Sequence, residues 1–213
     1  MPRTALKKAR ESPSSTKARI LAAAEEVFAC KGFEGASTRE IAAAAGVNIS
    51  SLHYHWESKE TLYFAVFEDI YDRLVELVRS AISTATLEEP ASRSVIDGAM
   101  GLLFDFFADH PNVPKLLVRR LLEADPTTSE IERDILLPAW RHFASWTAQH
   151  GNSQLSELEA RMFMLSVHSV MLLYMLDSQQ FVALLGSSIR APELRLRLRD
   201  HMTRLVHSLL RVK

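Results

Sequence analysis

The chain has 213 residues, of which 47% are hydrophobic, with only 7 glycines and 8 prolines. This length and composition indicate a helix-rich globular protein with one large or two small domains. The formal net charge of −1 excludes a uniformly basic nucleic-acid-binding protein, but the charge is unevenly distributed. Residues 1–19 have a net charge of +5, whereas residues 20–60 and 61–213 each have −3.

Residues 1–15 are expected to form a flexible basic arm. They are mostly small or basic and include a Ser/Pro-rich stretch at 12–15, which is typical of disordered termini. Two interpretations stay open for this arm. It either contacts DNA phosphates or a minor groove, or it is a solubilising tail.

A helix is expected from about Thr16 to Lys31, with Gly32 ending it. Its apolar residues recur at helical spacing. Cys30 is the single cysteine, which excludes a disulfide within one chain and fits a reducing compartment. We expect Cys30 to be a small buried side chain rather than a nucleophile. Lys17 is a candidate phosphate contact at the start of this helix.

Residues 37–59, with the sequence STREIAAAAGVNISSLHYHWESK, predict two short helices joined by a tight turn. Ser37 and Glu40 have the spacing of a capping box, and an alanine-rich run of high helix propensity follows them. Gly46 is expected to end the first helix and Asn48 to cap the second. Helix, glycine turn and helix in this order are typical of the helix-turn-helix motif.

The second of these helices, from about Ile49 to Trp56, has an unusual surface. Leu52 and Trp56 are one helical turn apart and are expected to face the core together. The other side chains are mostly short polar groups or aromatics with a hydrogen-bonding tip, which suit base edges and phosphates. With residues from the neighbouring helices, the candidate DNA contacts are Lys17, Thr38, Arg39, Asn48, Ile49, Ser50, Ser51, His53, Tyr54, His55 and Lys59.

Residues 16–62 resemble the N-terminal DNA-binding domain of TetR-family transcriptional regulators. The resemblance rests on a register of residues over the whole span rather than on one short motif. The residues in register are Thr16, Ile20, Leu21, Ala23, Ala24, Phe28, Gly32, Phe33, Ser37, Thr38, Ile41, Ala42, Ala45, Gly46, Val47, Leu52, His55, Ser58, Lys59 and Leu62. The resemblance implies an all-α fold of about nine helices, in which a three-helix DNA-binding domain (16–62) precedes a larger helical domain (63–213) for ligand binding and dimerisation.

Three residues depart from the family pattern. Ser50 stands where glycine is frequent, and Trp56 replaces the usual phenylalanine as an apolar residue that still fills the core. His53 occupies the usual tyrosine position of the recognition helix. Because an imidazole titrates near neutral pH, a DNA contact there is expected to depend on pH.

The remainder of the chain is expected to be helical, with breaks at proline-containing and glycine-containing segments. The helix that begins at Ser58 is long enough to belong to both domains. A loop is expected at 84–90 and a broken segment at 177–190. The predicted helices are 58–83, 91–109, 112–124, 127–150 with a bend at Pro138, 155–176, and 191–211.

The helices at 155–176 and 191–211 carry more apolar surface than one protomer can easily bury. One interpretation is a two-fold interface in which these helices of two chains form a four-helix bundle; the other is an ordinary internal core. The family resemblance favours a homodimer, since two recognition helices are needed to read two half-sites. The candidate interface residues are Leu158, Leu165, Leu194, Leu198, Met202, Leu205 and Leu209.

Aromatic and methionine side chains gather in the middle helices. A pocket of such residues suits an apolar or aromatic small molecule, although ordinary core packing would use the same residues. A lone histidine on an apolar helix can likewise be a hydrogen-bonded core residue. The candidate ligand-binding residues are Met100, Phe104, Phe107, Trp140, Phe143, Met164, His168 and Met171.

Enzyme signatures are absent from the sequence, which has no Walker A run, no G-x-G-x-x-G, no C-x-x-C, no H-E-x-x-H and no E-x-x-H. We therefore expect a protein that is not an enzyme and uses no cofactor or metal, with a helical enzyme of unrecognised site as the remaining alternative. A DNA-compacting protein without sequence preference would need a broadly basic surface, and the charge of residues 61–213 argues against it.

The sequence as a whole predicts a homodimeric, sequence-specific transcriptional regulator, a repressor released from a palindromic operator by a small, largely apolar ligand. The alternative is a helical DNA-binding protein without ligand control. A cytoplasmic location is expected, because no apolar h-region follows the basic first residues. The longest apolar stretch, 162–176, is too short to span a membrane.

Overall fold

The computed structural model describes residues 15–83, 93–122, 130–138, 140–141, 144–145 and 155–210. These residues contain nine α-helices, one π-helix and no strand, which confirms the expected all-α class. The contacts divide the chain into two units. Unit 1 comprises Met1–Asp72 and Lys115–Ile135, and unit 2 comprises Arg73–Pro114 and Leu136–Lys213. The expected arm, up to residue 14, and the expected loop at 84–90 lie outside the described residues.

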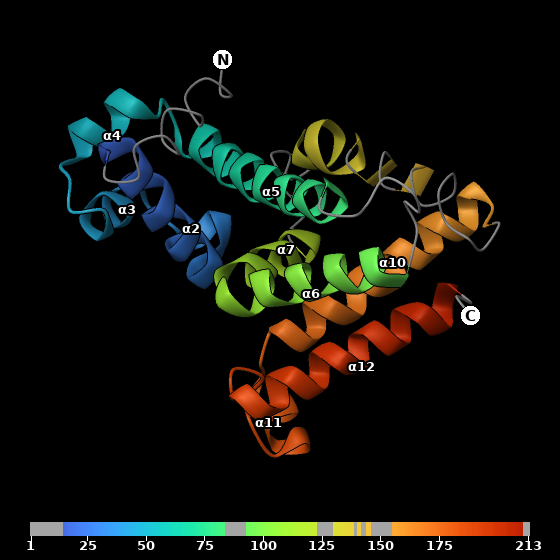
Figure 1. Ribbon diagram of the computed structural model, residues 1–213. Helices are drawn as coiled ribbons and strands as arrows, with labels where there is room; N and C mark the ends of the chain where they lie inside the picture. Colours follow the sequence, from blue (N-terminus) through green and yellow to red (C-terminus); the bar gives the residue numbers. More distant parts are fainter. Residues whose placement is uncertain are drawn as a thin grey trace. The chain divides into compact units, whose positions relative to one another are not determined.

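Unit 1 begins with the helices α2 (Thr16–Gly35), α3 (Thr38–Ala44) and α4 (Ile49–His55), followed by the first part of α5 (Lys59–Ser83). Helices α2, α3 and α4 pack against one another, as Figure 1 shows at the blue end of the chain. An aromatic cluster joins α2 to α5: the Tyr63 ring lies edge-on to Phe28 and Phe67, with centroids 4.9 and 5.0 Å away. All three rings are fully buried.

Helix α2 differs from its prediction in two respects. Gly32 interrupts the helix as expected, with φ 75° and ψ 178°, but a further turn continues to Gly35. This backbone conformation is accessible almost only to glycine. Cys30 is exposed, so the expectation of a buried cysteine was wrong. Residues two positions apart in an α-helix are rotated by about 200° around the helix axis. Cys30 therefore lies on the side of α2 opposite the buried Phe28.

Unit 1 also contains a polar cluster in which Tyr71 and Arg120 are buried and Glu132 is partly exposed. Arg120 lies on α7 (Asn112–Leu122), its side chain is 1% exposed, and its Nη1 donates to Glu132 Oε1 at 2.8 Å. Burial raises the pKa of the Tyr71 hydroxyl to about 12, while the nearby guanidinium of Arg120 opposes this shift. The ion pair therefore joins α7 to the segment that carries Glu132, and the Tyr71 hydroxyl of α5 is buried near it.

The segment that carries Glu132 is a π-helix, η1 (Glu132–Leu136), within the region predicted as one helix from 127 to 150. Pro138 lies two residues after the end of this π-helix. Proline has no N–H for the carbonyl of residue 134, and its ring crowds that carbonyl, which explains why the chain leaves α geometry before the proline. Residues 127–129, 139, 142–143 and 146–150 of the predicted helix lie outside the described part.

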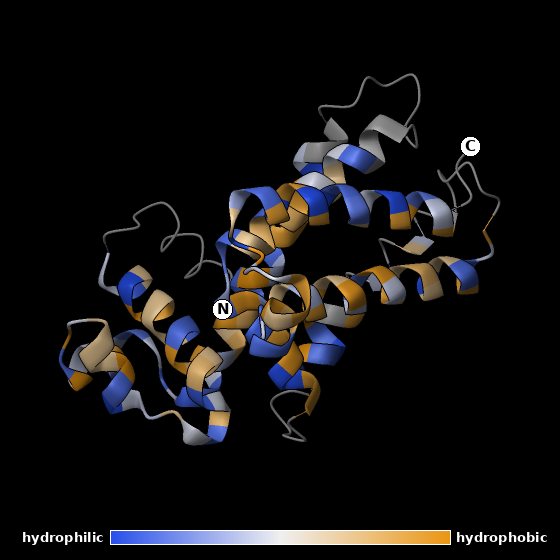
Figure 2. Cartoon of the chain, turned by 90° about the horizontal axis from the view of Figure 1, so that it is seen from below, coloured by the Kyte–Doolittle hydropathy of each residue, from blue (hydrophilic) through white to orange (hydrophobic). Residues whose placement is uncertain are grey.

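Unit 2 is built around α6 (Arg93–Asp109), α10 (Glu157–Met175) and α12 (Pro192–Leu210), which contact one another. Figure 1 shows the three helices in green, orange and red. In Figure 2, hydrophobic and hydrophilic residues alternate in stripes along the long helices. Ser156 and Glu159 form a complete capping box at the start of α10. The segment predicted as broken contains a short helix, α11 (Gln179–Leu185), begun by the Ser178 cap and ended by Gly186 at φ 75°.

An ionic ladder holds α12 against α6. Arg195 donates to Asp105 and Asp109 at 2.8 and 2.6 Å, and these hydrogen bonds lower the pKa of the Asp109 carboxyl. Because the acidic residues ascend along α6 while their partners descend along α12, the ladder defines an antiparallel register. Its pairs are Asp97 with His207, Asp105 with Arg199, and Asp109 with Arg195.

The buried ion pair predicts an unequal response to loss of its two partners. Glu132→Gln is expected to lower the free energy of unfolding by about 3 kcal/mol, because it leaves the Arg120 charge buried without a counter-charge. Arg120→Met is expected to cost less, since the Glu132 side chain is 44% exposed and water can hydrate it. Urea unfolding followed by circular dichroism measures both values. Equal costs, or a larger cost for Arg120→Met, would contradict this account.

Candidate nucleic-acid interface

The turn between α3 and α4 is fixed by a two-bond cap at the end of α3. The Gly46 N–H donates to the Ala43 carbonyl at 3.0 Å, and the Val47 N–H donates to the Ala42 carbonyl at 2.9 Å. This is the Schellman arrangement, which needs a left-handed residue at the position of Gly46. Gly46 has φ 64°, so the glycine expected to end this helix does so.

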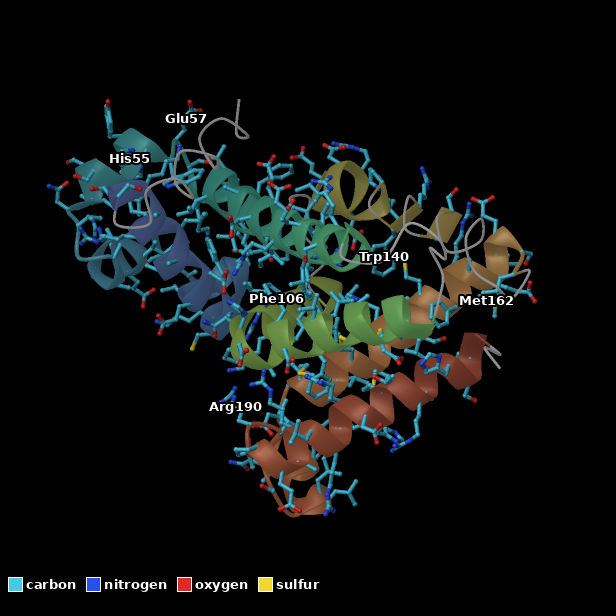
Figure 3. All side chains as sticks on the ribbon, in the orientation of Figure 1. His55, Glu57, Phe106, Trp140, Met162 and Arg190 are labelled. Atoms are coloured by element: carbon cyan, nitrogen blue, oxygen red, sulfur yellow. The ribbon has the colours of Figure 1, made fainter. Side chains whose placement is uncertain are left out.

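Helix α4 starts directly after this turn and presents most of its side chains outward. Asn48 caps it, with Oδ1 accepting the Ser51 N–H at 2.7 Å. Leu52 and Trp56 are 0% and 5% exposed, which confirms that they face the core together. The solvent-facing residues include Tyr54, at 85% exposure, and Figure 3 labels His55 at this end of unit 1. Ser51 and His55 are half-buried, and the exposed members of the predicted set are Asn48, Ile49, Ser50, His53 and Tyr54.

Helix α3 adds an exposed cation beside its N-terminus. Ser37 caps the helix, its Oγ accepting the Glu40 N–H at 3.2 Å. Glu40 does not complete the expected capping box, because its carboxylate bonds the Ser37 hydroxyl and the Lys31 ammonium instead of the Ser37 N–H. Thr38 is half-buried and Arg39 is exposed.

Lys59 and Lys17, both predicted as phosphate contacts, have other partners in the structure. The Lys59 ammonium donates to the Phe33 carbonyl at 2.9 Å and to the Ala36 carbonyl at 3.3 Å, and it lies 4.3 Å from the centre of the Phe33 ring. It therefore ties the start of α5 to the end of α2. The Lys17 ammonium lies 4.6 Å from the centre of the Trp56 ring.

Arg19 is a residue that the sequence reasoning did not single out. It lies in the first turn of α2, and its Nη2 donates to the Ala45 carbonyl at 2.5 Å and to the Gly46 carbonyl at 2.9 Å. Nothing in the local sequence signals this role, because the two carbonyls are 26 and 27 residues away.

Most cations of this region are thus engaged within the protein. Residues 15–60 contain five basic residues, Lys17, Arg19, Lys31, Arg39 and Lys59. Within this described stretch, Arg39 is the one for which the structure gives no protein partner. Of the lysines and arginines predicted to contact phosphates, Arg39 is therefore the one whose prediction the structure leaves unchanged.

The predicted ligand-binding residues belong to unit 2. The structure brings the Trp140 ring edge-on to the His168 ring, with centroids 5.1 Å apart. Phe143 lies outside the described residues. Trp140, Met164 and His168 are half-buried, and the fully buried members of the set are Met100, Phe104, Phe107 and Met171.

The predicted dimer residues divide into three groups by exposure. Leu198 and Met202 are buried within the protomer, at 6% and 1% exposure, on the helix that contacts α6 and α10, so their assignment to a dimer interface is corrected. Leu194 and Leu205 are half-buried. Leu158, Leu165 and Leu209 are exposed.

Helix α10 has a longer exposed apolar stripe than the sequence analysis identified. Leu158, Met162, Leu165 and Leu173 are 65%, 60%, 51% and 50% exposed, and their spacing places them on one face. Figure 3 labels Met162 on this helix. By length and composition, α10 is also a candidate membrane span, and only 22% of its most apolar 18-residue stretch is buried. Its long apolar face is thus largely uncovered in one protomer.

Residues 20–66 match the sequence model of the family described as "Bacterial regulatory proteins, tetR family". The match covers most of α2, all of α3 and α4, and the first turns of α5. Two curated proteins are similar to this chain: the transcriptional activator FasR of Mycolicibacterium smegmatis, 39% identical over 87 residues, and the transcriptional regulator RutR of Escherichia coli, 33% identical over 113 residues. These alignments cover 41% and 53% of this chain. The chain spans 38% of the length of FasR and 51% of that of RutR.

Solved structures extend the similarity in fold beyond the TetR-type domain. A transcriptional regulator from Rhodococcus sp. RHA1 has a TM-score of 0.65 at 19% identity and covers 92% of this chain and 97% of its own. The fatty acid degradation regulator FadR from Bacillus halodurans has a TM-score of 0.68 at 18% identity and covers 90% and 96% of the two chains. These identities show a common fold and no more. The described residues contain no group of three or more His, Cys, Asp or Glu side chains placed to hold a metal ion.

The division of the cations predicts different signatures for Arg39 and Lys59. Arg39→Gln is expected to lower the slope of log affinity against log salt by about 0.9, the value for one phosphate contact. Lys59→Gln is expected to leave the slope unchanged and to lower the melting temperature, because its ammonium bonds backbone carbonyls. Fluorescence anisotropy over a salt series, with thermal melting, separates the two. A lowered slope for Lys59→Gln would show that Lys59 contacts a phosphate and would contradict this account.

Proposed function

We propose that this protein is a sequence-specific DNA-binding transcriptional regulator that reads a palindromic operator with the outer face of α4. The observation that carries the proposal is the exposure of Ser50, His53 and Tyr54 on a capped helix, within the residues that match the TetR family. Their hydroxyl and imidazole groups suit base edges and phosphates. His53, in place of the usual tyrosine, is a specificity-determining position in this proposal.

We propose that the protein acts as a repressor. FasR is named an activator and RutR a regulator, so the sign of the effect comes from a physical argument and not from these names. Repression needs only occupancy of the operator, whereas activation needs an additional surface for the transcription machinery.

The same proposal includes a homodimer that uses the exposed stripe of α10. Two recognition helices related by a two-fold axis match the symmetry of a palindrome. The stripe consists of apolar side chains at least half exposed in one protomer, and a partner copy would remove them from water. Serines and a histidine within α10 (Ser166, His168 and Ser169) suit a protein interface better than a lipid environment. We therefore propose a cytoplasmic location. We also propose that the protein has no enzyme activity, because the family and the relatives that it resembles are transcriptional regulators.

We further propose that a small, largely apolar ligand in unit 2 releases the protein from its operator. The apolar residues of α6 and the Trp140–His168 pair support this chemistry, and FadR, which shares the fold, is a fatty acid degradation regulator. A ligand that changes operator affinity a hundredfold must favour one conformation by about 2.7 kcal/mol. Modest repacking can supply such a difference.

The proposed coupling would follow the segments of chain that connect the two units. The chain passes between the units within α5 after Asp72, within α7 after Pro114, and within η1 after Ile135. Tyr71, Arg120 and Glu132 lie on these three segments, and in unit 1 they form one polar cluster. A displacement carried along any of the segments would therefore reach the others through this cluster.

The dimer predicts that Leu165→Glu gives a monomer, because two carboxylates would be buried at the two-fold interface. Leu196→Glu is the matched control. Leu196 is 62% exposed and lies on α12, not on the proposed α10 interface. It is nine residues before Leu205, so the two side chains point to opposite sides of α12. Sedimentation equilibrium measures both. A Leu165→Glu protein that stays dimeric would remove α10 from the interface.

The function itself is tested by selecting the DNA duplexes that the protein binds from a random pool. The affinity for the most enriched duplex is then measured at increasing salt concentration. Enrichment of one inverted repeat bound by a dimer is expected. Equal, salt-sensitive binding of all duplexes would contradict sequence-specific regulation, and no binding would contradict DNA binding altogether. The selected operator then serves to screen apolar and aromatic compounds for release.

A further inference from the structure

We propose that Arg19 is a positioning residue for DNA recognition, which sets the orientation of α4 by holding the turn that precedes it. This inference rests on the proposed function, since it concerns how the recognition helix meets the operator. Arg19 itself need not touch DNA. Its guanidinium acts through backbone carbonyls of the helix-turn-helix.

The first step is the pair of hydrogen bonds from one nitrogen. Arg19 Nη2 donates to Ala45 O at 2.5 Å and to Gly46 O at 2.9 Å. Carbonyls at a helix C-terminus lack intrahelical donors and carry the negative end of the helix dipole. A cation that donates to two of them is therefore held both by charge and by direction, because hydrogen bonds to an ionised donor are stronger than neutral ones.

The second step is the fit between Arg19 and Gly46. A Cβ placed on Gly46 would lie 2.9 Å from Arg19 Nη2, and Gly46 has φ 64°. The left-handed backbone favours glycine at this position. A larger residue would in addition force the end of the Arg19 side chain to move away from the turn.

The turn is joined to the recognition helix by a short connection. Gly46 is followed by Val47 and by Asn48, which caps α4. With so short a connection, a change at the Gly46 peptide rotates the axis of α4. Lys17, from the same turn of α2, covers Trp56 at the other end of α4, at 4.6 Å from the ring centre. The first turn of α2 therefore holds α4 at both ends.

Arg19 is exposed and close to a surface proposed to meet DNA, so a direct phosphate contact is the competing role. The two roles differ in what they change. Loss of a phosphate contact lowers the salt slope and weakens all duplexes alike. Loss of a positioning contact leaves the slope and reduces the preference for the operator over other duplexes.

The test compares Arg19→Gln, Arg19→Lys and the matched control Arg39→Gln on the selected operator and on a scrambled duplex. Arg19→Gln is expected to lower the operator-to-scrambled affinity ratio about tenfold, the effect of losing one base-pair contact, with an unchanged salt slope. Arg19→Lys is expected to restore most of this ratio, because an ammonium can still donate to both carbonyls. Arg39→Gln is expected to show the opposite signature, a slope lowered by about 0.9 and an unchanged ratio.

Hydrogen exchange without DNA provides the second readout. The Gly46 and Val47 amides, which cap α3, are expected to exchange faster in Arg19→Gln than in the original chain. A slope lowered in Arg19→Gln with the ratio intact, or unchanged exchange of these amides, would overturn the proposal. If the original chain selects no operator, the proposed function fails, whereas the exchange measurement still decides whether Arg19 holds the turn.

Discussion

Unit 1 depends on donors for the carbonyl groups that α2 and α3 leave unpaired near their C-termini. Helix α3 ends in a turn whose Ala45 and Gly46 carbonyls are bonded by Arg19, and the residues around the end of α2 offer carbonyls that Lys59 bonds. Each cation comes from a different helix than the carbonyls it serves. The caps are therefore also the links that join α2 to α3 and α2 to α5.

This use of cations shapes the electrostatics of the proposed interface. A surface that meets phosphates needs positive potential, yet in residues 15–60 most basic side chains serve internal contacts. Within this stretch, Arg39 is the basic residue for which the structure gives no protein partner, and the sequence before residue 15 contains further basic residues. Under the proposed function, recognition by α4 rests mainly on hydroxyl, amide and imidazole groups, which favour directional contacts over general attraction to DNA.

In unit 2, charge decides which helix surface is left for a partner. The ion pairs of the ladder hold one side of α12 against α6, and Leu198 and Met202 of α12 are buried inside the protomer. Helix α10 has no comparable ladder among the described residues, and its stripe of Leu158, Met162, Leu165 and Leu173 stays exposed. The proposed interface accordingly centres on α10 rather than on both helices equally.

Local signals in the sequence determined the all-α class, the helix-turn-helix, the caps at Ser37, Asn48 and Gly46, and the inward face of Leu52 and Trp56. These features depend on residues within a few positions of one another, where backbone geometry and helical period leave few alternatives. Only the tertiary structure decided the partners of Lys17, Arg19 and Lys59, the exposure of Cys30, the π-helix at 132–136 and the burial of Leu198. Each of these depends on which distant backbone or side chain lies opposite, and a long cationic side chain carries the same sequence signal whether it meets a phosphate or a carbonyl.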